Sequence, residues 1–254
     1  MRITQRRWGT VAAGLAIGAL AMTSLVAAPG SAQPPAPTYE VTITNLTSGQ
    51  PLTPPVAAVH RGGLDVFDVG SAASFEVQQV AENGNAGPLL ETLGDSRHVS
   101  DFLETTTGPL VPAGLPGAAD FDDSVTFTLS GGPGVTRLTF VSMLICTNDG
   151  FTGLDRVELP RKVGDVSTYR TLAYNAGTEI DTEDLANMVP PCQGLAGVTD
   201  DEGAPGTGTT DPALAEGGVI HHHAGIQGIA DLDPDAQGWD VDAPVAEIVI
   251  ERVD

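Results

Sequence analysis

The hydrophobic pattern of this chain is mostly that of short strands. In "SVTFTLS" (124–130), apolar residues alternate with hydroxyl residues, which is typical of a strand with one buried face. Glycine and proline separate many such stretches, as turns between strands require. These signals predict strands over 38–47, 124–130, 134–146, 168–175, 217–225 and 243–253. The chain is therefore predicted to be mainly β.

Turn and helix signals add to this pattern. The glycine-rich turn at 131–134 predicts a hairpin between the two strands that flank it. A helix is predicted over 70–85, capped by Ser71 or Ser74 and ended by "NGN", and a second short helix over 88–95. The predicted fold is an all-β, antiparallel β-sandwich with a short helical insert near the N-terminal third.

Residues 1–32 have the pattern of a secretory signal peptide. Arginines precede an apolar run, and "GSAQ" offers a cleavage site after Ala32. The run is also about long enough to remain as an uncleaved membrane anchor, but it is weak in Leu and Ile and ends in Pro and Gly. The arginine pair at 6–7 is a weak sign of twin-arginine export. We expect a protein secreted or held in the cell envelope, with 33–38 disordered and one domain over 39–254.

The charge balance restricts the classes of partner. The chain carries 33 acidic and 11 basic residues, and removing the signal peptide takes away three arginines and no acid, which leaves a net charge of −25. Nucleic-acid binding needs a basic face, so the composition argues against it. It also argues against docking on anionic lipid without a cation between, and no stable membrane insertion is expected after signal cleavage. Strong acidity instead favours cation binding.

The chain has two cysteines, Cys146 and Cys192. An even number in an exported chain favours one disulfide, the alternative being two buried thiols. The bridge would close a loop of about 46 residues and would tie together the two acidic loops described next.

Two predicted strands are followed by loops rich in oxygen ligands. Asn148 and Asp149 follow the strand that ends at Cys146, and Asn175 and Glu179 follow the next strong strand signal. If both strand ends lie at the same end of the sandwich, these side chains converge. Hard cations such as Ca²⁺ take six to eight oxygen ligands. The alternative is two independent loops whose acids are only solvated.

The order of several motifs resembles the spondin N-terminal domain family, the F-spondin/mindin-like domains. "YEVTITNLT", a helix ending in "AENGN", then "NDGF", "AYNAGTE" and "HHHAGIQGIADLDPDAQGW" run from about Tyr39 to Val253. "AYNAGTE" is the most specific of these pieces. The resemblance implies a C2-like β-sandwich that binds Ca²⁺ and that contributes to adhesion in animal relatives.

The resemblance also implies a set of metal ligands. In the family, one Asp in the loop matching "NDGF" and two Asp four residues apart hold the ion. Carried over, the ligands here are Asp149, Asn175 and Glu179. The last two stand where the family has Asp. Both keep an oxygen donor, but Asn175 removes one charge, which should weaken the affinity for Ca²⁺.

A second acidic stretch, 231–242, has a partial resemblance to an EF-hand loop. Asp231, Asp233 and Asp235 have the spacing of the first three ligands. However, Ala236 replaces the required Gly, the twelfth position lacks Glu, and flanking helices are not indicated. A structural loop with exposed acids is therefore predicted.

The histidine run "HHH" raises the question of a transition metal. On a strand, His221 and His223 would share one face, and His222 would point the other way. A pair two residues apart can bind zinc, but the sequence indicates no third ligand. We therefore expect polar residues near a sheet edge.

Motifs of common enzymes are missing. The sequence has no G-x-S-x-G, no H-E-x-x-H and no phosphate-binding loop. The sequence therefore predicts a calcium-binding extracellular or cell-surface interaction or adhesion module without catalysis, whose partner is an unidentified extracellular protein or glycan. Because active sites assemble in space, a secreted calcium-dependent hydrolase acting on polysaccharide or lipid is the alternative.

Overall fold

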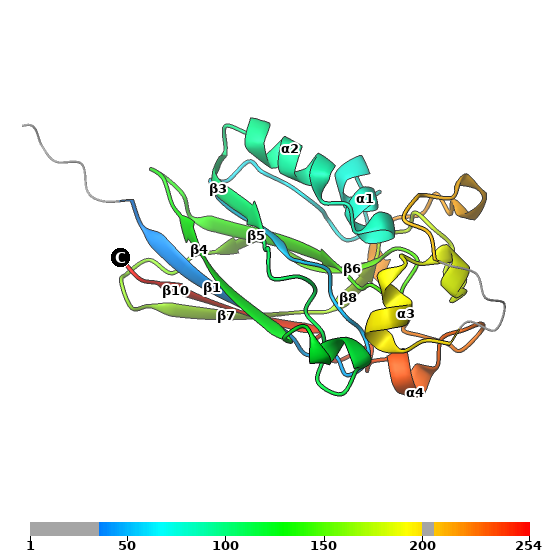
Figure 1. The fold of residues 1–254 in the computed structure, drawn as a ribbon. Coiled ribbons are helices and arrows are strands. Elements are labelled where there is room, and N and C mark those ends of the chain that lie inside the picture. The colour runs from blue at the N-terminus through cyan, green and yellow to red at the C-terminus, as the bar shows by residue number, and fades with distance from the viewer. Residues whose placement is uncertain (1–35, 200–205) are drawn as a thin grey trace, which may run out of the picture. The chain divides into compact units, whose positions relative to one another are not determined.

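Two antiparallel β-sheets form the centre of the computed structural model, which describes residues 36–199 and 206–254 (Figure 1). The four-stranded sheet has the order β4-β1-β10-β7, and the six-stranded sheet has the order β3-β2-β5-β6-β8-β9. The predicted all-β, antiparallel sandwich is confirmed. The strands are β1 (Thr38–Asn45), β2 (Val56–His60), β3 (Val99–Glu104), β4 (Ser124–Ser130), β5 (Arg137–Met143), β6 (Gly150–Glu158), β7 (Val166–Thr171), β8 (Ala173–Asn175), β9 (His221–His222) and β10 (Ala246–Arg252).

Helices are few and short, and they fall in two groups. The first group is the insert that the sequence predicts, and the second lies at one end of the sandwich (Figure 1). The helices are α1 (Phe75–Asn83), α2 (Gly87–Asp95), α3 (Pro191–Ala196) and α4 (Pro234–Gln237), with 3-10 turns η1 (Pro116–Ala119), η2 (Leu185–Asn187) and η3 (Pro212–Leu214).

One hydrophobic layer lies between the two sheets. Strands β1 and β10 pair so that Val41 is opposite Ile250 and Ile43 is opposite Ile248, and these four side chains are fully buried. Phe140 of β5 packs into the same layer from the six-stranded sheet. Because side chains alternate along a strand, this register leaves Glu40, Thr42 and Thr44 on the outer face.

Strand β2 is buried on both of its faces. Ala57 and Val59 pack into the layer between the sheets, whereas Val56 and Ala58 pack into a second layer under the helices. A strand covered on both sides needs no polar alternation, so "VAAVH" carries no period-two signal. This explains why the sequence pattern does not predict β2.

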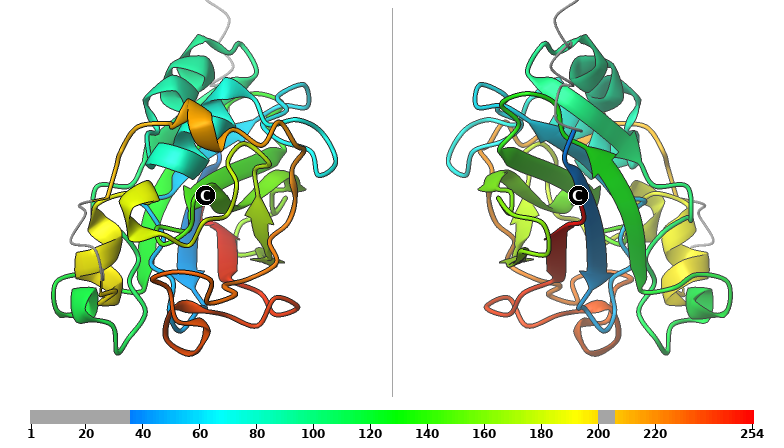
Figure 2. Two further views of the ribbon diagram at one scale, coloured as in Figure 1. Left: turned by 90° about the vertical axis from the view of Figure 1, so that its right-hand side faces the viewer. Right: turned by 90° about the vertical axis from the view of Figure 1, so that its left-hand side faces the viewer.

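Helices α1 and α2 cover the outer face of the six-stranded sheet, on the side away from β1 and β10 (Figure 2). The Ser74 hydroxyl accepts a hydrogen bond from the Val77 N–H, and Gly84, at φ 61°, closes α1 in the left-handed region. The two predicted helices are therefore present. The first is shorter than the prediction of 70–85, because its cap is Ser74 rather than Ser71.

The predicted hairpin around the turn at 131–134 is wrong. Strand β4 pairs with β1 in the four-stranded sheet, and β5 pairs with β2 and β6 in the other. The glycine-rich turn therefore passes the chain from one sheet to the other. A turn signal shows where a chain reverses, but it does not decide whether the flanking strands share hydrogen bonds.

The strand predicted over 168–175 is two strands in different sheets. Thr171 is opposite Ala246 in the four-stranded sheet, whereas Ala173 is opposite Thr152 in the six-stranded sheet. The chain changes sheet within two residues, so the polar–apolar pattern continues across the break. Strands that switch sheets at a corner are a known feature of sandwiches.

Other element boundaries also differ from the sequence patterns. Strands β3 and β6 are not predicted, and the strand expected over 217–225 is reduced to two residues. Thr38 begins β1, so the disordered segment predicted over 33–38 is too long at its end. The predicted signal peptide, 1–32, lies outside the described residues. Among the residues that the structure does describe, no helix is both long and apolar enough to span a bilayer.

Candidate functional site

The two acidic loops of the sequence meet beside strands β6 and β8. Gly150, the first residue of β6, is opposite Asn175, the last residue of β8. The Ala176 N–H also donates to the Asp149 carbonyl at 3.1 Å. Because the strands are antiparallel, the loop before β6 and the loop after β8 lie at the same end of the sheet. The two loops are therefore neighbours, whereas a common binding point for their side-chain oxygens stays a prediction.

Asp149 is the centre of this meeting, and its two carboxylate oxygens differ. The side chain is 0 % exposed. Oδ2 accepts hydrogen bonds from the N–H groups of Thr178 and Glu179, at 2.7 and 3.0 Å, and from the Thr178 hydroxyl at 3.2 Å. Oδ1 is buried and has no hydrogen-bond partner. Such an oxygen is costly to bury, and it is the kind of atom that a cation would stabilise.

The buried environment of Asp149 raises the pKa of its carboxyl group. Burial raises the pKa of this carboxyl to about 6, although the N–H groups of Glu179 and Thr178 lower it. The negative charge of Asp181 adds to the rise. The ionised form of Asp149 is therefore destabilised in the folded protein when no cation is present.

Asn175 and Glu179 are also buried, at 2 % and 4 % exposure. The Asn175 Oδ1 accepts from the Gly177 N–H at 2.7 Å, and its Nδ2 donates to Asp181 at 3.2 Å. The Glu179 Oε1 accepts from the Asp211 N–H at 3.1 Å. The pKa of Glu179 is raised to about 7, chiefly by burial and also by nearby carboxylates, and the hydrogen bond from the Asp211 N–H opposes this rise. Both side chains thus already serve as local acceptors, each with lone pairs to spare.

Gly177 allows close packing of the turn after β8. Its φ is +70°, and an added Cβ would lie 2.6 Å from the backbone of Val219. The Gly218 N–H donates to the Gly177 carbonyl at 2.7 Å. The small residues of "AYNAGTE" therefore let the segment at 218–219 lie against the turn.

Several acids of "EIDTED" hold neighbouring backbone. Glu183, at φ 56°, directs its carboxylate to the N–H groups of Gln227 and Ile229, the second at 2.8 Å. Asp184 caps η2 by accepting from the Ala186 N–H at 2.9 Å. These two acids stabilise the loops structurally, because each satisfies backbone donors that lack another partner.

The histidine run divides between surface and interior. Strand β9 is an edge strand, and its residues, His221 and His222, are exposed. His223 is buried and packs against Trp239, whereas the His222 ring packs against Tyr174, so His222 points away from His223 as expected. The His223 Nδ1 accepts from the Gly225 N–H at 3.0 Å, and its Nε2 lies 3.7 Å from Asp181. Burial lowers the pKa of His223 to about 4, so the ring is neutral at pH 7.

Three acids of 231–242, which are Asp231, Asp233 and Asp240, accept hydrogen bonds from backbone N–H groups, in agreement with the prediction of a structural loop. Asp231 accepts from the Leu185 N–H at 2.8 Å, and Asp233 caps α4 by accepting from the Asp235 N–H at 2.9 Å. Throughout residues 36–199 and 206–254, no group of three or more His, Cys, Asp or Glu side chains is placed to hold a metal. A cation at Asp149 would therefore need the Asn175 amide and backbone oxygens as well as carboxylates.

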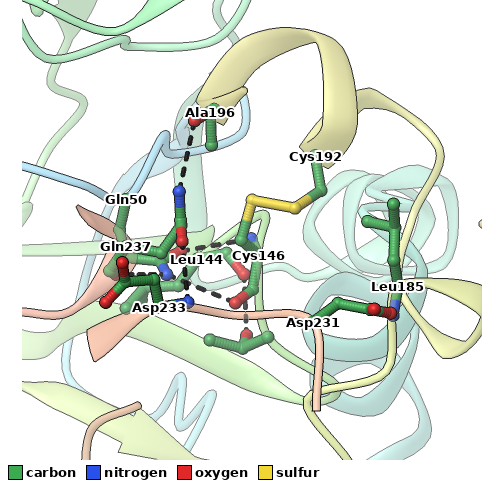
Figure 3. The surroundings of a disulfide bond; sticks show 10 residues. Gln50, Leu144, Cys146, Leu185, Cys192, Ala196, Asp231, Asp233 and Gln237 are labelled. Carbon is green, nitrogen blue, oxygen red and sulfur yellow. Dashed lines mark hydrogen bonds between the residues drawn. A yellow bond between two sulfur atoms is a disulfide. The ribbon is translucent and has the colours of Figure 1, made fainter. Parts of the chain in front are cut away.

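The predicted disulfide is confirmed and lies beside this site. Cys146 and Cys192 are bonded, with a Cα–Cα distance of 5.1 Å (Figure 3). The buried amide of Gln50 accepts from the Cys146 N–H at 3.1 Å and donates to the Gln237 carbonyl at 2.8 Å. The Gln237 side chain in turn donates to the Ala196 carbonyl in α3 at 3.3 Å. The loop before β6 is thus fixed to α3 and α4 by a covalent bond and two buried amides.

A second polar group in the six-stranded sheet was not predicted from the sequence. A β-bulge lies where β5 pairs with β6. The Thr139 hydroxyl is 2.9 Å from the His60 Nε2, donates to Asp155 at 2.9 Å and accepts from the Arg156 N–H at 3.0 Å. His60 is 0 % exposed. Because the hydroxyl lies between the ring and the carboxylate and the ring is enclosed, this arrangement joins strands and does not present a nucleophile. These residues are distant in sequence, so only the pairing of strands could reveal them.

Comparison with known proteins adds no relative. No protein-family model matches the chain. No curated protein matches it either. The likeness to the spondin N-terminal domain therefore rests on the motifs of the sequence, and the metal ligands that it implies stay a prediction.

Proposed function

We propose that this protein is a calcium-stabilised, non-catalytic interaction module that works outside the cytoplasm, at the cell surface or in the cell envelope. The observation that supports the proposal is the buried, unpartnered Oδ1 of Asp149. It lies where two loops meet, on a carboxylate whose other oxygen accepts from the Glu179 N–H. An all-oxygen ligand set of Asp149, Asn175 and Glu179 would suit a hard cation such as Ca²⁺.

The energetic argument concerns uncompensated negative charge. Asp149, Glu179 and Asp181 all have raised pKa values, about 6, 7 and 6. Ionising them in the folded protein costs free energy, because each is partly or fully removed from water. A bound cation would offset this cost, and the affinity would be modest because one ligand is a neutral amide. Extracellular modules work with dissociation constants of about 10⁻⁴ to 10⁻³ M.

The motif order gives independent support for the class of protein. The ligands that the spondin-like pattern implies belong to the two loops that lie side by side at β6 and β8, which supports the proposal. We therefore propose a spondin-like binding module. Its partner would be an extracellular protein or glycan, since the net charge of −25 in the processed chain opposes polyanions.

Thermal unfolding in Ca²⁺ and in chelator tests the proposal. At a hundredfold excess over the dissociation constant, Ca²⁺ should stabilise the processed protein by about 2.7 kcal/mol. Asp149→Ala should abolish this difference, because it removes the charged ligand. Asn175→Asp should enlarge it by adding a charge. The readout is the calcium-dependent difference, since Asp149→Ala also removes an acceptor for two backbone N–H groups.

A matched control is available at Asp235, an exposed acid of the EF-hand-like stretch. Asp235→Ala removes the same charge far from the loops that contain the proposed ligands in sequence, so it should leave the calcium-dependent shift intact. A wild-type midpoint that is the same in Ca²⁺ and chelator would sink the calcium proposal. So would a shift that Asp235→Ala removes and Asp149→Ala retains.

A further inference from the structure

A separate apolar cavity lies near the disulfide. Its volume is about 390 Å³, within the range of small-molecule sites. One wall comes from the end of α1 and the residues before β2, and the other from the start of α3. Its lining includes Pro54, Pro109, Phe121, Pro190, Pro191 and Leu195.

The walls of this cavity are rigid. Proline side chains have no rotamers that could swing in to fill the space. Pro191 begins α3 and is followed by Cys192, which is bonded to Cys146, the neighbour of the lining residue Ile145. The disulfide thus joins the start of α3 to the segment that contains Ile145. A preformed site of this kind loses little conformational entropy when a ligand binds.

The aromatic wall is held in place by backbone shape. Gly108 has a φ of +91°, and an added Cβ there would lie 2.5 Å from the Phe121 ring. The ring therefore packs directly on backbone that only glycine permits. Phe121 is the one aromatic residue of the lining, and four of the other lining residues are prolines.

The lining also specifies the charge of the ligand. No lining residue is ionisable, although the chain carries 33 acidic and 11 basic residues. A charged ligand would lose its hydration there without gaining a partner. The polar members of the lining are Thr53 and Asn83, and the Asn83 amide donates to Thr210 at 3.0 Å.

We propose that this cavity binds a small, uncharged, apolar molecule with a planar ring, packed between the Phe121 ring and the prolines. The site uses none of the proposed calcium ligands. It therefore stands or falls independently of the proposed function.

The test is a fluorescence titration of the processed protein with Nile red, a neutral ring dye. Saturable binding of one dye per chain is expected. Gly208 lines the cavity, and an added Cβ there would meet no atom within 4 Å, so Gly208→Phe should fill the space without a clash. This variant should weaken dye binding at least tenfold. Gly194→Phe is the matched control, because Gly194 in α3 is equally open but is not a lining residue.

Phe121→Ala is the second variant and should weaken binding several-fold by removing the aromatic wall. Circular dichroism and the thermal midpoint establish that each variant is folded. If Gly208→Phe does not fold, the dye affinity of Phe121→Ala decides the test. Toluene should displace the dye, and the affinity should be equal in Ca²⁺ and in chelator. The proposal is overturned by non-saturable binding, by equal binding in Phe121→Ala and wild type, or by displacement with a proline-rich peptide but not with toluene.

Discussion

At the scale of single residues, Asp149 is one of three carboxyls, with Glu179 and Asp181, whose raised pKa values make the site respond to pH. The folded-state pKa of Asp149 is about 6, above the value of 3.8 for an unperturbed Asp. Between these values the folded protein binds more protons than the unfolded chain. The free energy of unfolding therefore falls as pH rises through this window, by an amount on the order of 2–3 kcal/mol for this group.

We accordingly predict that, in chelator, Asp149→Asn removes this loss of stability between about pH 4 and pH 6. The comparison with wild type is needed because Glu179 and Asp181 act in the same sense as Asp149, and His223 acts in the opposite sense. Its folded-state pKa of about 4 lies below the unperturbed 6.5, so its contribution to stability rises with pH over much of the same window. Urea unfolding at several pH values measures the difference. Parallel profiles for wild type and Asp149→Asn would contradict the prediction.

Thr139 provides a second prediction at this scale. Thr139→Val keeps the shape of the side chain but removes the hydroxyl that contacts His60, Asp155 and the Arg156 N–H. Buried groups left without a partner cost about 1–3 kcal/mol each, partly relieved by relaxation. We expect a loss of about 2–3 kcal/mol in urea unfolding. Thr126→Val, at an exposed Thr–Thr pair with Thr42, should change stability by less than about 0.5 kcal/mol.

At the scale of elements, the loops at the end of the sandwich are held by side chains that accept hydrogen bonds from the backbone of neighbouring loops. Glu183 joins the loop after β8 to the segment at 227–229 through two backbone N–H groups. Glu183→Ala should destabilise the protein by about 1–3 kcal/mol, because both donors lose their acceptor. Glu183→Gln keeps one acceptor oxygen and should cost less.

Hydrogen exchange distinguishes this local role from a general loss of stability. In Glu183→Ala the amides of Gln227 and Ile229 should exchange faster than any change in global stability requires. The amide of Val249, in the centre of β10, serves as the reference. Equal acceleration at all three amides would mean that Glu183 does not hold the 227–229 segment specifically.

At the scale of the whole molecule, the disulfide joins the sheet to the helices at its end. It spans 46 residues of sequence, for which the chain-entropy estimate is roughly 3–4 kcal/mol. The double variant Cys146→Ala/Cys192→Ala should lose about this much in urea unfolding. Reduced wild type should behave similarly, and a loss below about 1 kcal/mol in both would show that the buried amides of Gln50 and Gln237 hold this junction without the bond.

Local features of the sequence determine several parts of this molecule. Alternation along 38–47 and 124–130 predicts strands because one face of each is buried and the other solvated. Ser74 caps the start of α1 and Gly84 caps its end, and both caps depend on local sequence. The even cysteine number predicts the bond, and acids after two strand ends predict that two loops meet.

Tertiary structure alone decides the rest, because long-range pairing leaves no local signature. Alternation indicates that one face of a strand is buried, but it does not indicate which strand is the hydrogen-bonded neighbour. The sequence pattern therefore could not show that β4 and β5 lie in different sheets. Strand β2, buried on both faces, shows no alternation at all. The free oxygen of Asp149, the hydroxyl between His60 and Asp155, and the apolar cavity depend on atoms that are distant in sequence. These features exist only in the folded structure, where the pairing of both sheets sets which residues are neighbours.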